Sequence, residues 1–492
     1  MRFPGRFPKA LISGVSAAVL LFSFGGCGSE KSPIGYLIDA VGGDPYALTE
    51  EGSRELARFN SVYREYASQS PDGQFGHFSD AFKRVRVNYI HEIPDAKLID
   101  AAIKGVRELE AEPQTVPPRE LVEAALDSMM ASLDPHSAYL NPDELHETEV
   151  SNRGEFGGLG IEVTMEDGVI KIISPLEDTP AWRAGLKSGD KITHLDGKPL
   201  KGKTLLQAVK LMRGRPGTDI RLTVNRDGYP PFGVTITRAV IKVQSVRWRI
   251  LDDIGYIRVA RFTERVEDGV EEAMAGIHEK LGPRLKAVVL DLRNNPGGLL
   301  DQSVILADAF LDQGTIVTVK GRRPGSERVF EAKSGDLARG LPMVVLINGG
   351  SASASEIVAG ALQDHHRAFL MGVRSFGKGS VQTITPLPRE GALKLTTQLY
   401  FSPSGRAIQA LGVEPDIRIA PAEPGKLQRE ADLPGAFPGT AAGTTMTRAS
   451  LSESDCPAAG EKEDRPLGCA LAFLRAGSAE NFLAQIRSRA GI

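Results

Sequence analysis

Three serines at residues 351–355 could supply a nucleophile for covalent chemistry. The run reads SASASE and opens a stretch with helical spacing, where serines usually cap the helix. A serine there could instead attack a carbonyl carbon, because a helix N-terminus offers free N–H groups and a positive field to the oxyanion that develops. A serine hydroxyl is a weak nucleophile and needs a neighbouring base. The nearby candidates are His365, His366 and Lys378.

Lys378 lies between two glycines, Gly377 and Gly379, which allow the backbone to bend into a tight site. A lysine acts as a base only if its pKa falls far below its ordinary value of about 10.4, and desolvation is the usual cause of such a fall. The residues alone are compatible with a serine hydrolase. They leave open which serine reacts and which base activates it.

Two strand–turn–helix units are predicted to position these side chains. A strand at Lys286–Leu292 leads through a glycine-rich turn into a helix. A second strand at Met343–Ile347 leads through another glycine-rich turn into a helix at Ser353–Leu362. Units of this kind place active sites at the carboxyl ends of the strands. We therefore expect an α/β domain over residues 254–419.

Residues 151–240 have a different character, with short β-rich runs between Gly and Pro turns. In order along the chain stand FGGLGI at residues 156–161, TPA at 179–181 and AGLKSGDKI at 184–192. This succession resembles a PDZ domain. In that family the Gly-Leu-Gly-Ile loop presents N–H groups to the terminal carboxylate of a peptide, which adds to the domain as an extra strand. The loop residues are Gly158, Leu159, Gly160 and Ile161, and the groove-lining helix residues would be Leu205, Ala208, Val209 and Met212.

The region around the three serines is similar to the carboxy-terminal processing proteases, also called tail-specific proteases. The resemblance rests on NGGSASASEIVAGALQ at residues 348–363 and SFGKGSVQ at 375–382. Further matches are DLRNNPGG at 291–298, LDPHS at 133–137 and SPSGR at 402–406. The resemblance covers residues 78–420 and includes the PDZ-like insertion.

The resemblance implies a role for each residue that falls on a family position. It assigns the nucleophile to Ser353, the general base to Lys378, the residue that orients the lysine to Gln382, and the oxyanion donors to the backbone N–H groups of Ala354 and Gly298. It also implies a core similar to the crotonase and Clp protease fold. Pro296 stands where the family usually has glycine. Because proline has no N–H group, this turn can supply a donor only from Gly297 or Gly298.

The first 27 residues resemble a bacterial export signal. Arg2, Arg6 and Lys9 form a basic start, and residues 10–24 form an apolar run that is short for a membrane span. Two glycines before Cys27 resemble a lipobox, in which the cysteine is acylated and becomes the mature N-terminus. An ordinary cleaved signal peptide is the alternative. We expect an exported protein on the periplasmic side of a bacterial membrane, anchored through lipid on Cys27.

The chain is long enough for several domains. We expect a multidomain α/β protein with a crotonase- or Clp-protease-like α/β core, a β-rich PDZ domain and a small N-terminal helical domain. The expected segments are a signal peptide with a lipobox at 1–27, a tether with at most one short helix at 28–77, the helical domain at 78–150, the PDZ domain at 151–240, the peptidase core at 241–420, and a C-terminal tail at 421–492 that is loose up to a helix near Leu467–Arg475.

Composition and cysteines limit the other classes of function. Of 492 residues, 41% are apolar and 25% charged, and a net charge of −3 without a long basic run gives no sign of a nucleic-acid partner. The three cysteines form no C-x-x-C pair, so we expect no metal site and no cofactor. If Cys27 carries lipid, an oxidising compartment favours a disulfide between Cys456 and Cys469, with two unpaired thiols as the alternative.

These features predict a serine endopeptidase that binds apolar C-terminal tails through its PDZ domain and cleaves exported proteins near the C-terminus. An adaptor protein and a homo-oligomer are partners that the sequence leaves open. One alternative is a PDZ protease of the Ser–His–Asp kind, but the chain has no G-x-S-x-G motif. Another is a catalytically inactive PDZ scaffold, which loss of Ser353, Lys378 or Gln382 would favour. A phosphate-binding loop ending at Lys378 fails, because Gly379 stands where Ser or Thr should bind magnesium.

Overall fold

The computed structural model describes residues 44–68, 73–166, 168–176, 178–203, 205–242, 244–421, 428–439, 449–460 and 463–490. The predicted export signal and Cys27 lie outside these residues. The chain divides into two compact units, Met1–Ala47 and Leu48–Ile492. All elements below belong to the second unit. Within the described residues, no helix is both long and apolar enough to cross a membrane.

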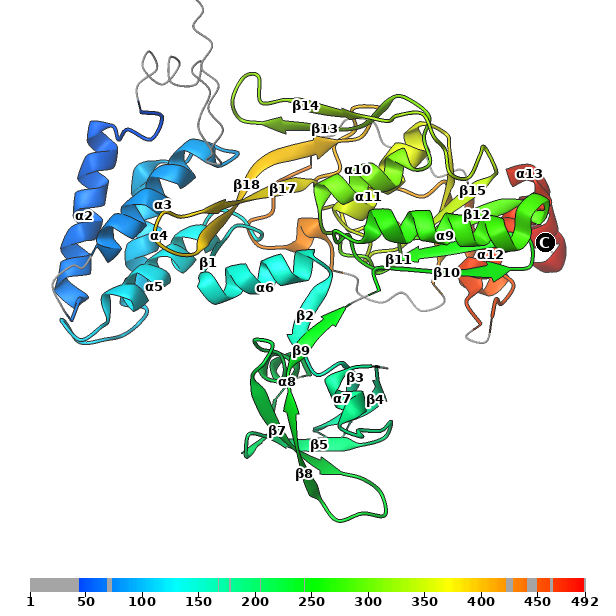
Figure 1. Cartoon of the computed structure of the whole chain (residues 1–492). Coiled ribbons are helices and arrows are strands. Elements are labelled where there is room, and N and C mark those ends of the chain that lie inside the picture. Colours follow the sequence, from blue (N-terminus) through cyan, green and yellow to red (C-terminus); the bar gives the residue numbers. More distant parts are fainter. Residues whose placement is uncertain are drawn as a thin grey trace, which may run out of the picture. The chain divides into compact units, whose positions relative to one another are not determined.

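Four helices form the N-terminal part of this unit. They are α2 (Glu50–Tyr66), α3 (Gln74–Asn88), α4 (Asp95–Arg107) and α5 (Pro118–Ala131) (Figure 1). Their apolar faces share one buried core, in which the rings of Phe59 and Phe78 stack 3.8 Å apart. We expected a tether here, and α2 differs from that expectation. Leu56, Phe59 and Tyr63 recur at a spacing of three to four residues and are buried, which ties α2 to the other helices.

A seven-stranded sheet forms the centre of the α/β core. Its order is β10 (Val246–Leu251), β11 (Ile254–Val259), β12 (Ala287–Asp291), β15 (Met343–Ile347), β16 (Phe369–Gly372), β19 (Ile417–Ala420) and β20 (Ala449–Ser452). β10 is antiparallel to β11, and all the other neighbours are parallel. The strand predicted at Met343–Ile347 matches β15, and the one at Lys286–Leu292 contains β12.

Both faces of this sheet are buried. In β12, Val288 and Leu290 belong to the core on one face, whereas Ala287 and Val289 belong to the core on the other. The first face packs against α9 (Val266–Leu281), α10 (Leu300–Asp308) and α11 (Ala354–Asp364), and the second against α12 (Arg465–Ala476) and α13 (Ala479–Ala490). Near-continuous apolar runs are typical of parallel strands covered on both sides.

The C-terminal segment contains the helix that we expected near Leu467–Arg475, as α12, but the segment before it is more ordered than the loose tail that we expected. β20 extends the core sheet as a parallel partner of β19, and a disulfide joins Cys456 to Cys469 in α12 with an S–S distance of 2.09 Å. Leu467, Phe473 and Phe482 are buried against the sheet. The apolar residues of α12 and α13 therefore cover the second face of the sheet.

A second, five-stranded antiparallel sheet joins one strand that follows the helical region to four strands from residues 315–401. Its order is β1 (Ala138–Leu140), β18 (Ala392–Phe401), β13 (Thr315–Gly321) and β14 (Arg328–Glu331), with β17 (Ser380–Pro386) also paired to β18. In the β17–β18 pair Gln382 stands opposite Thr396. In the β1–β18 pair Ala138 stands opposite Lys394. Helix α6 (Pro142–Asn152) follows β1 and begins with a capping box at Asn141.

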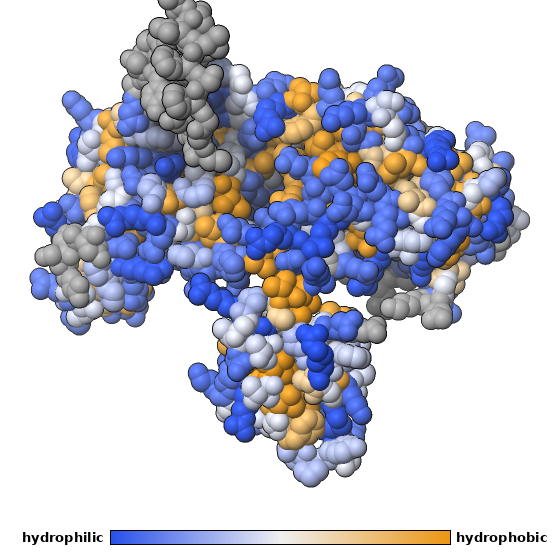
Figure 2. Space-filling view, viewed as in Figure 1, coloured by the Kyte–Doolittle hydropathy of each residue, from blue (hydrophilic) through white to orange (hydrophobic). Residues whose placement is uncertain are grey.

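Residues 155–242 form a separate β-rich lobe. Its sheet has the order β3 (Ile161–Glu166), β4 (Val169–Pro175), β5 (Lys191–Leu195), β7 (Asp219–Asn225) and β8 (Phe232–Thr237), with β6 (Lys198–Pro199) beside β5, the helices α7 (Pro180–Arg183) and α8 (Leu205–Met212), and a ribbon of β2 (Glu155–Gly158) with β9 (Ala239–Lys242). The lobe has its own apolar core. Figure 2 shows apolar side chains gathered over this lobe, flanked by hydrophilic ones.

Candidate active site

Ser353 lies at a strained turn between β15 and α11. Its φ is 55° and its ψ is −113°, a backbone conformation that residues with a side chain rarely adopt. Such a conformation costs about 1–3 kcal/mol and persists only where the surrounding structure imposes it. The strain places Ser353 directly before the first residue of α11, at the end of the helix that favours negative charge.

The three serines of the run have different surroundings. Ser351 Oγ donates to the Leu292 carbonyl oxygen (2.8 Å), and Ser355 Oγ donates to the Asn295 carbonyl oxygen (2.9 Å). Both side chains are fully buried, whereas Ser353 is partly exposed. The outer serines therefore tie the two glycine-rich turns together, and Ser353 is the member of the run that a substrate could reach.

Three backbone N–H groups in the two glycine-rich turns differ in their hydrogen bonds. The Gly297 N–H donates to Asn295 Oδ1 (2.9 Å) and is already used. The N–H groups of Gly298 and Ala354 have no partner among the residues that the structure describes. The Ala354 group is one of the free donors at the start of α11. A Cβ atom on Gly297 would lie only 2.9 Å from Ser353 Cβ and 3.1 Å from the Ala354 nitrogen, so glycine allows the two turns to touch.

The Glu356 carboxylate binds the backbone of Ser353 and that of the lysine loop together. It accepts hydrogen bonds from the N–H groups of Ser353 (2.7 Å), Gly377 (2.6 Å) and Lys378 (3.0 Å). It also accepts one from the Ser375 hydroxyl (2.5 Å). Burial raises the pKa of Glu356 to about 7, and these four donors oppose that rise. One side chain thus fixes the nucleophile candidate and the base candidate relative to each other.

The Tyr400 hydroxyl makes a second link between the same two residues. It lies 3.1 Å from the Ser353 carbonyl oxygen and also within hydrogen-bonding distance of the Lys378 carbonyl oxygen. Burial raises the pKa of Tyr400 well above its ordinary value, so the hydroxyl keeps its proton for donation. Both backbone ends of the Ser353–Lys378 pair, N–H and C=O, are therefore held by side chains.

Lys378 has the electrostatics that a lysine base requires. Burial and, to a smaller extent, the neighbouring cation Lys394 lower its pKa to about 8. The carboxylates of Glu430, Asp134 and Glu356 act in the opposite direction. Desolvation and a like charge are the two ordinary ways of lowering the pKa of a lysine.

Gln382 lies on β17, four residues beyond Lys378. Its Nε2 atom donates to Ser380 Oγ (3.0 Å) and to Thr396 Oγ1 (3.2 Å). The side chain is partly buried. The nitrogen end of the amide therefore faces the two hydroxyls.

Sequence reasoning did not assign roles to Glu356, Tyr400, Thr396 or Glu430. The spacing of Glu356, three residues after Ser353, is that of a capping box and could have indicated its bond to the Ser353 N–H. Glu430 was expected in a loose tail. Its carboxylate instead accepts from Gln409 Nε2 (3.0 Å), and Gln409 Oε1 accepts the N–H of the residue after Lys378 (2.9 Å). No local pattern near the serines indicates that contact.

The glycine loop of the β-rich lobe has the shape expected for peptide binding. Gly160 has a φ of 76°, and a Cβ atom there would lie 2.2 Å from Thr179 Cβ. The carbonyl of Leu159 accepts from Ala181 N (2.9 Å), which fixes the loop against α7. The loop runs from Gly158 into Ile161, the start of β3, which is an edge strand of its sheet. An edge strand can accept one more strand.

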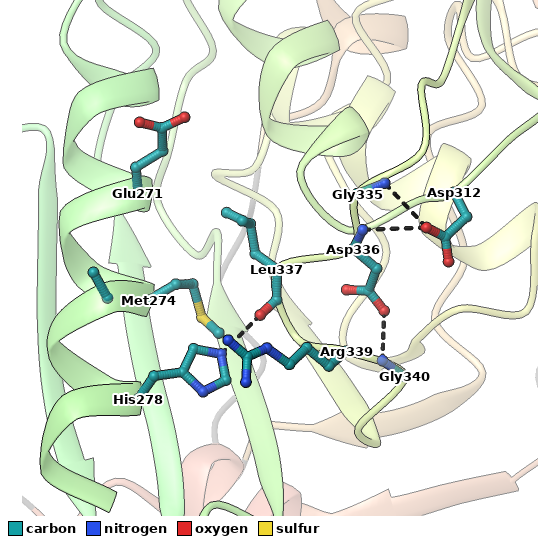
Figure 3. A pocket seen from close by; sticks show the side chains of 10 residues that line it. Glu271, Met274, His278, Asp312, Gly335, Asp336, Leu337, Arg339 and Gly340 are labelled. Atoms are coloured by element: carbon teal, nitrogen blue, oxygen red, sulfur yellow. Dashed lines mark hydrogen bonds between the residues drawn. The ribbon is translucent and has the colours of Figure 1, made fainter. Parts of the chain in front are cut away.

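One surface pocket has no lining residue in common with this site. It measures about 610 Å³ and lies between α9 and the loop at residues 335–340 (Figure 3). Three of its polar side chains are used within the protein. Asp336 accepts the N–H of Gly340 (2.7 Å), Asp312 accepts that of Gly335 (3.0 Å), and His278 Nε2 bonds the Leu337 carbonyl (2.9 Å). No cluster of side chains suited to a metal ion occurs in the part of the chain that the structure describes.

Comparisons with protein families match two parts of the chain. Residues 253–419 match peptidase family S41, and residues 157–230 match the PDZ domain. A carboxy-terminal-processing protease of Bartonella bacilliformis is 49% identical over 348 residues, which cover 70% of this chain and 75% of that protein. The carboxy-terminal processing protease CtpA of Bacillus subtilis is 31% identical over 361 residues, which cover 73% of this chain and 72% of that protein.

Solved structures include two similar proteins. One is described as a photosystem II D1 C-terminal processing protease, with 27% identity, a TM-score of 0.46, and coverage of 71% of this chain and 93% of that one. The other is the PDZ domain of a carboxy-terminal protease from Vibrio cholerae in complex with a peptide. It is 27% identical, covers 18% of this chain and 99% of that one, and has a TM-score of 0.17.

Proposed function

Because the chain belongs to the carboxy-terminal processing proteases of peptidase family S41, we propose that Ser353 is its nucleophile and Lys378 its general base. One observation carries this proposal. Of the three serines in the run, only Ser353 is open to a substrate, and the carboxylate that binds its N–H also binds the N–H of Lys378. A serine peptidase needs nucleophile and base side by side, and this shared contact supports that arrangement.

The proposed reaction proceeds through an acyl-enzyme. The neutral amine of Lys378 takes the proton of the Ser353 hydroxyl as Oγ attacks the scissile carbonyl carbon. The tetrahedral oxyanion accepts hydrogen bonds from the N–H groups of Ala354 and Gly298. The intermediate then collapses, the C–N bond breaks, and the lysine ammonium returns its proton to the leaving amine. Water, deprotonated by the same lysine, releases the acyl group from Ser353.

Gln382 completes the proposed centre by orienting the lysine. Both hydrogens of its amide nitrogen are directed to hydroxyl groups, so its oxygen is free to accept an N–H of Lys378. That bond leaves the lone pair of the neutral amine for the serine proton. The lowered pKa of Lys378, about 8, supports this role because it enlarges the fraction of neutral amine near neutral pH.

The PDZ domain and the protease family imply binding of a peptide substrate. We propose that apolar, unstructured C-terminal tails add to the edge strand β3, with their carboxylate at the loop of Gly158, Leu159, Gly160 and Ile161. The partly buried apolar side chains of this region support an apolar tail preference: Ile161, Val163, Met165, Leu205 and Val209. An adaptor protein and a homo-oligomer stay open as further partners.

The predicted N-terminal signal bears on where the enzyme works. We propose that it is exported and held on the periplasmic side of a membrane by lipid on Cys27. A single acyl chain anchors a protein weakly, whereas two or more anchor it firmly. Mass measurement of the mature N-terminus is expected to find lipid on Cys27. An unmodified, soluble product cut near residue 27 would contradict anchoring and leave export intact.

A comparison of protein C-termini tests the proposed function as a whole. Cells that carry the wild-type chain and cells that carry Ser353→Ala are compared by proteomic sequencing of C-termini. We expect a set of exported proteins to keep longer C-terminal tails in the variant. Identical C-termini in the two strains would contradict a tail-processing role.

A further inference from the structure

The orientation of the Gln382 amide is determined by a chain of hydrogen bonds that begins outside the α/β core. Gln382 Nε2 lies 3.2 Å from Thr396 Oγ1, and Thr396 Oγ1 lies 3.0 Å from Asp134 Oδ1. A carboxylate only accepts, so the single hydroxyl hydrogen of Thr396 goes to Asp134. The hydroxyl oxygen can then only accept from Gln382, which requires the nitrogen end of the amide at this place.

Asp134 is itself held in one orientation. It is 3% exposed, and its carboxylate accepts the Ser137 hydroxyl (2.6 Å) and the N–H groups of His136 (2.9 Å) and Ser137 (3.1 Å). Ser137 Oγ in turn accepts the Thr396 N–H (3.1 Å). These bonds fix the turn of residues 134–137 beside β18, so that the Asp134 carboxylate is held ready to accept the Thr396 hydroxyl.

The strand register brings this turn to the catalytic candidates. The turn leads into β1, which pairs with β18, and on β18 Thr396 stands directly opposite Gln382 of β17. Asp134 and Gln382, about 250 positions apart in the sequence, are thus connected by hydrogen bonds through Thr396. This chain of hydrogen bonds runs from the buried Asp134 carboxylate through the Thr396 hydroxyl to the Gln382 amide.

We propose that Asp134 and Thr396 are positioning residues that keep the amide oxygen of Gln382 turned toward Lys378. The inference rests on the proposed Ser–Lys function. The neutral amine of a base has one lone pair, and that pair must take the serine proton. An amide oxygen accepts an N–H of the lysine and leaves the pair free. A flipped amide would aim N–H donors at the pair and block it. Asp134 and Thr396 exclude the flipped form.

Two substitutions at Thr396 test this role. Thr396→Val keeps the shape and removes the hydroxyl, and we expect kcat to fall at least about tenfold with little change in KM, since one directed hydrogen bond is lost. Thr396→Ser keeps the hydroxyl and is expected to restore most of kcat. Thr397→Val is the matched control. Its hydroxyl pairs with Thr383 Oγ1 (2.7 Å) on the other face of the same strand, so kcat should stay near the wild-type value.

A double-variant cycle separates positioning from a general loss of structure. If Thr396 acts through Gln382, Thr396→Val lowers kcat in the wild-type background and not in the Gln382→Ala background. A wild-type kcat in Thr396→Val, or an equal loss in both backgrounds, would overturn the inference. Ser353→Ala distinguishes this failure from that of the proposed function. If Ser353→Ala keeps its activity, the Ser–Lys mechanism itself is wrong. If Ser353→Ala is inactive and Thr396→Val has the wild-type kcat, only the role proposed for Thr396 is wrong.

Discussion

The rate of proteolysis is expected to rise with pH as Lys378 loses its proton. With a pKa of about 8, about one lysine in eleven is neutral at pH 7. With the ordinary pKa of about 10.4, only about one in 2,500 would be neutral at that pH. The neutral fraction of Lys378 should therefore increase about tenfold from pH 6 to pH 7 and level off above pH 8 to 9. Glu356, whose pKa is about 7, also ionises in this range and contributes to the change in rate. Below the pKa the base is protonated and the rate is lost.

Lys394→Met tests the cause of this low pKa. The substitution removes the cation that lowers the pKa of Lys378 and keeps the length of the side chain. The pKa of Lys378 should rise, and each unit of rise lowers the rate at pH 7 about tenfold while the plateau at high pH is unchanged. Other charged groups that act on Lys378 are Glu430, Asp134 and Glu356, and the variant leaves them in place.

The assay is the initial rate of cleavage of an unfolded polypeptide, measured from pH 6 to pH 10 with substrate well below KM. Lys333→Met, at an exposed position, is the control and should follow the wild-type profile. A wild-type profile that is flat between pH 6 and pH 8 would refute a lysine base with this pKa. A profile of Lys394→Met that matches the wild type would refute Lys394 as a cause.

Three further results are expected. Glu356→Gln should abolish activity and lower the free energy of unfolding by at least about 3 kcal/mol in urea titrations, because a buried acceptor of four hydrogen bonds loses its charge. Tyr400→Phe should lower activity less. Unchanged stability in both variants would contradict the role of these side chains in linking Ser353 to Lys378. Replacing Cys456 and Cys469 by serine should lower the free energy of unfolding by about 3 kcal/mol, and equal stability with and without reductant would argue against the disulfide. Two acidic residues added to the end of a substrate's apolar tail should slow cleavage, and equal rates would deny the PDZ domain this selectivity.

Local patterns in the sequence predicted much of the core. The strand at Met343–Ile347, its glycine-rich turn and the helix after it are where the periodicity of apolar residues placed them. The PDZ-like lobe could be predicted for the same reason, since its strands at Lys191–Leu195 and its turn glycines follow closely along the chain. Each of these features is determined by residues that are near one another in the sequence.

Features that depend on distant contacts could not be predicted. The segment after Pro421 is rich in Ala, Gly and Pro, yet β20 joins the sheet as a parallel partner of β19, and Leu467 and Phe473 of α12 cover the second face of the sheet. The length of α2 and its place in the helical core were not predicted, because its apolar residues gain their partners from α3, α4 and α5. Asp134 reaches Gln382 through Thr396, and Glu430 reaches the lysine loop through Gln409. These contacts join residues that are far apart in the sequence, and no local motif encodes them.

The most direct measurement of the central claim compares four purified variants on one unfolded substrate with an apolar tail. Ser353→Ala and Lys378→Ala should each lose at least about a thousandfold in kcat/KM, and the double variant should be no worse, because the pair acts as a unit. Ser351→Ala should retain most activity per folded molecule, since its hydroxyl only bonds a buried carbonyl. Full activity in Ser353→Ala, or loss in Ser351→Ala without loss in Ser353→Ala, would contradict the assignment.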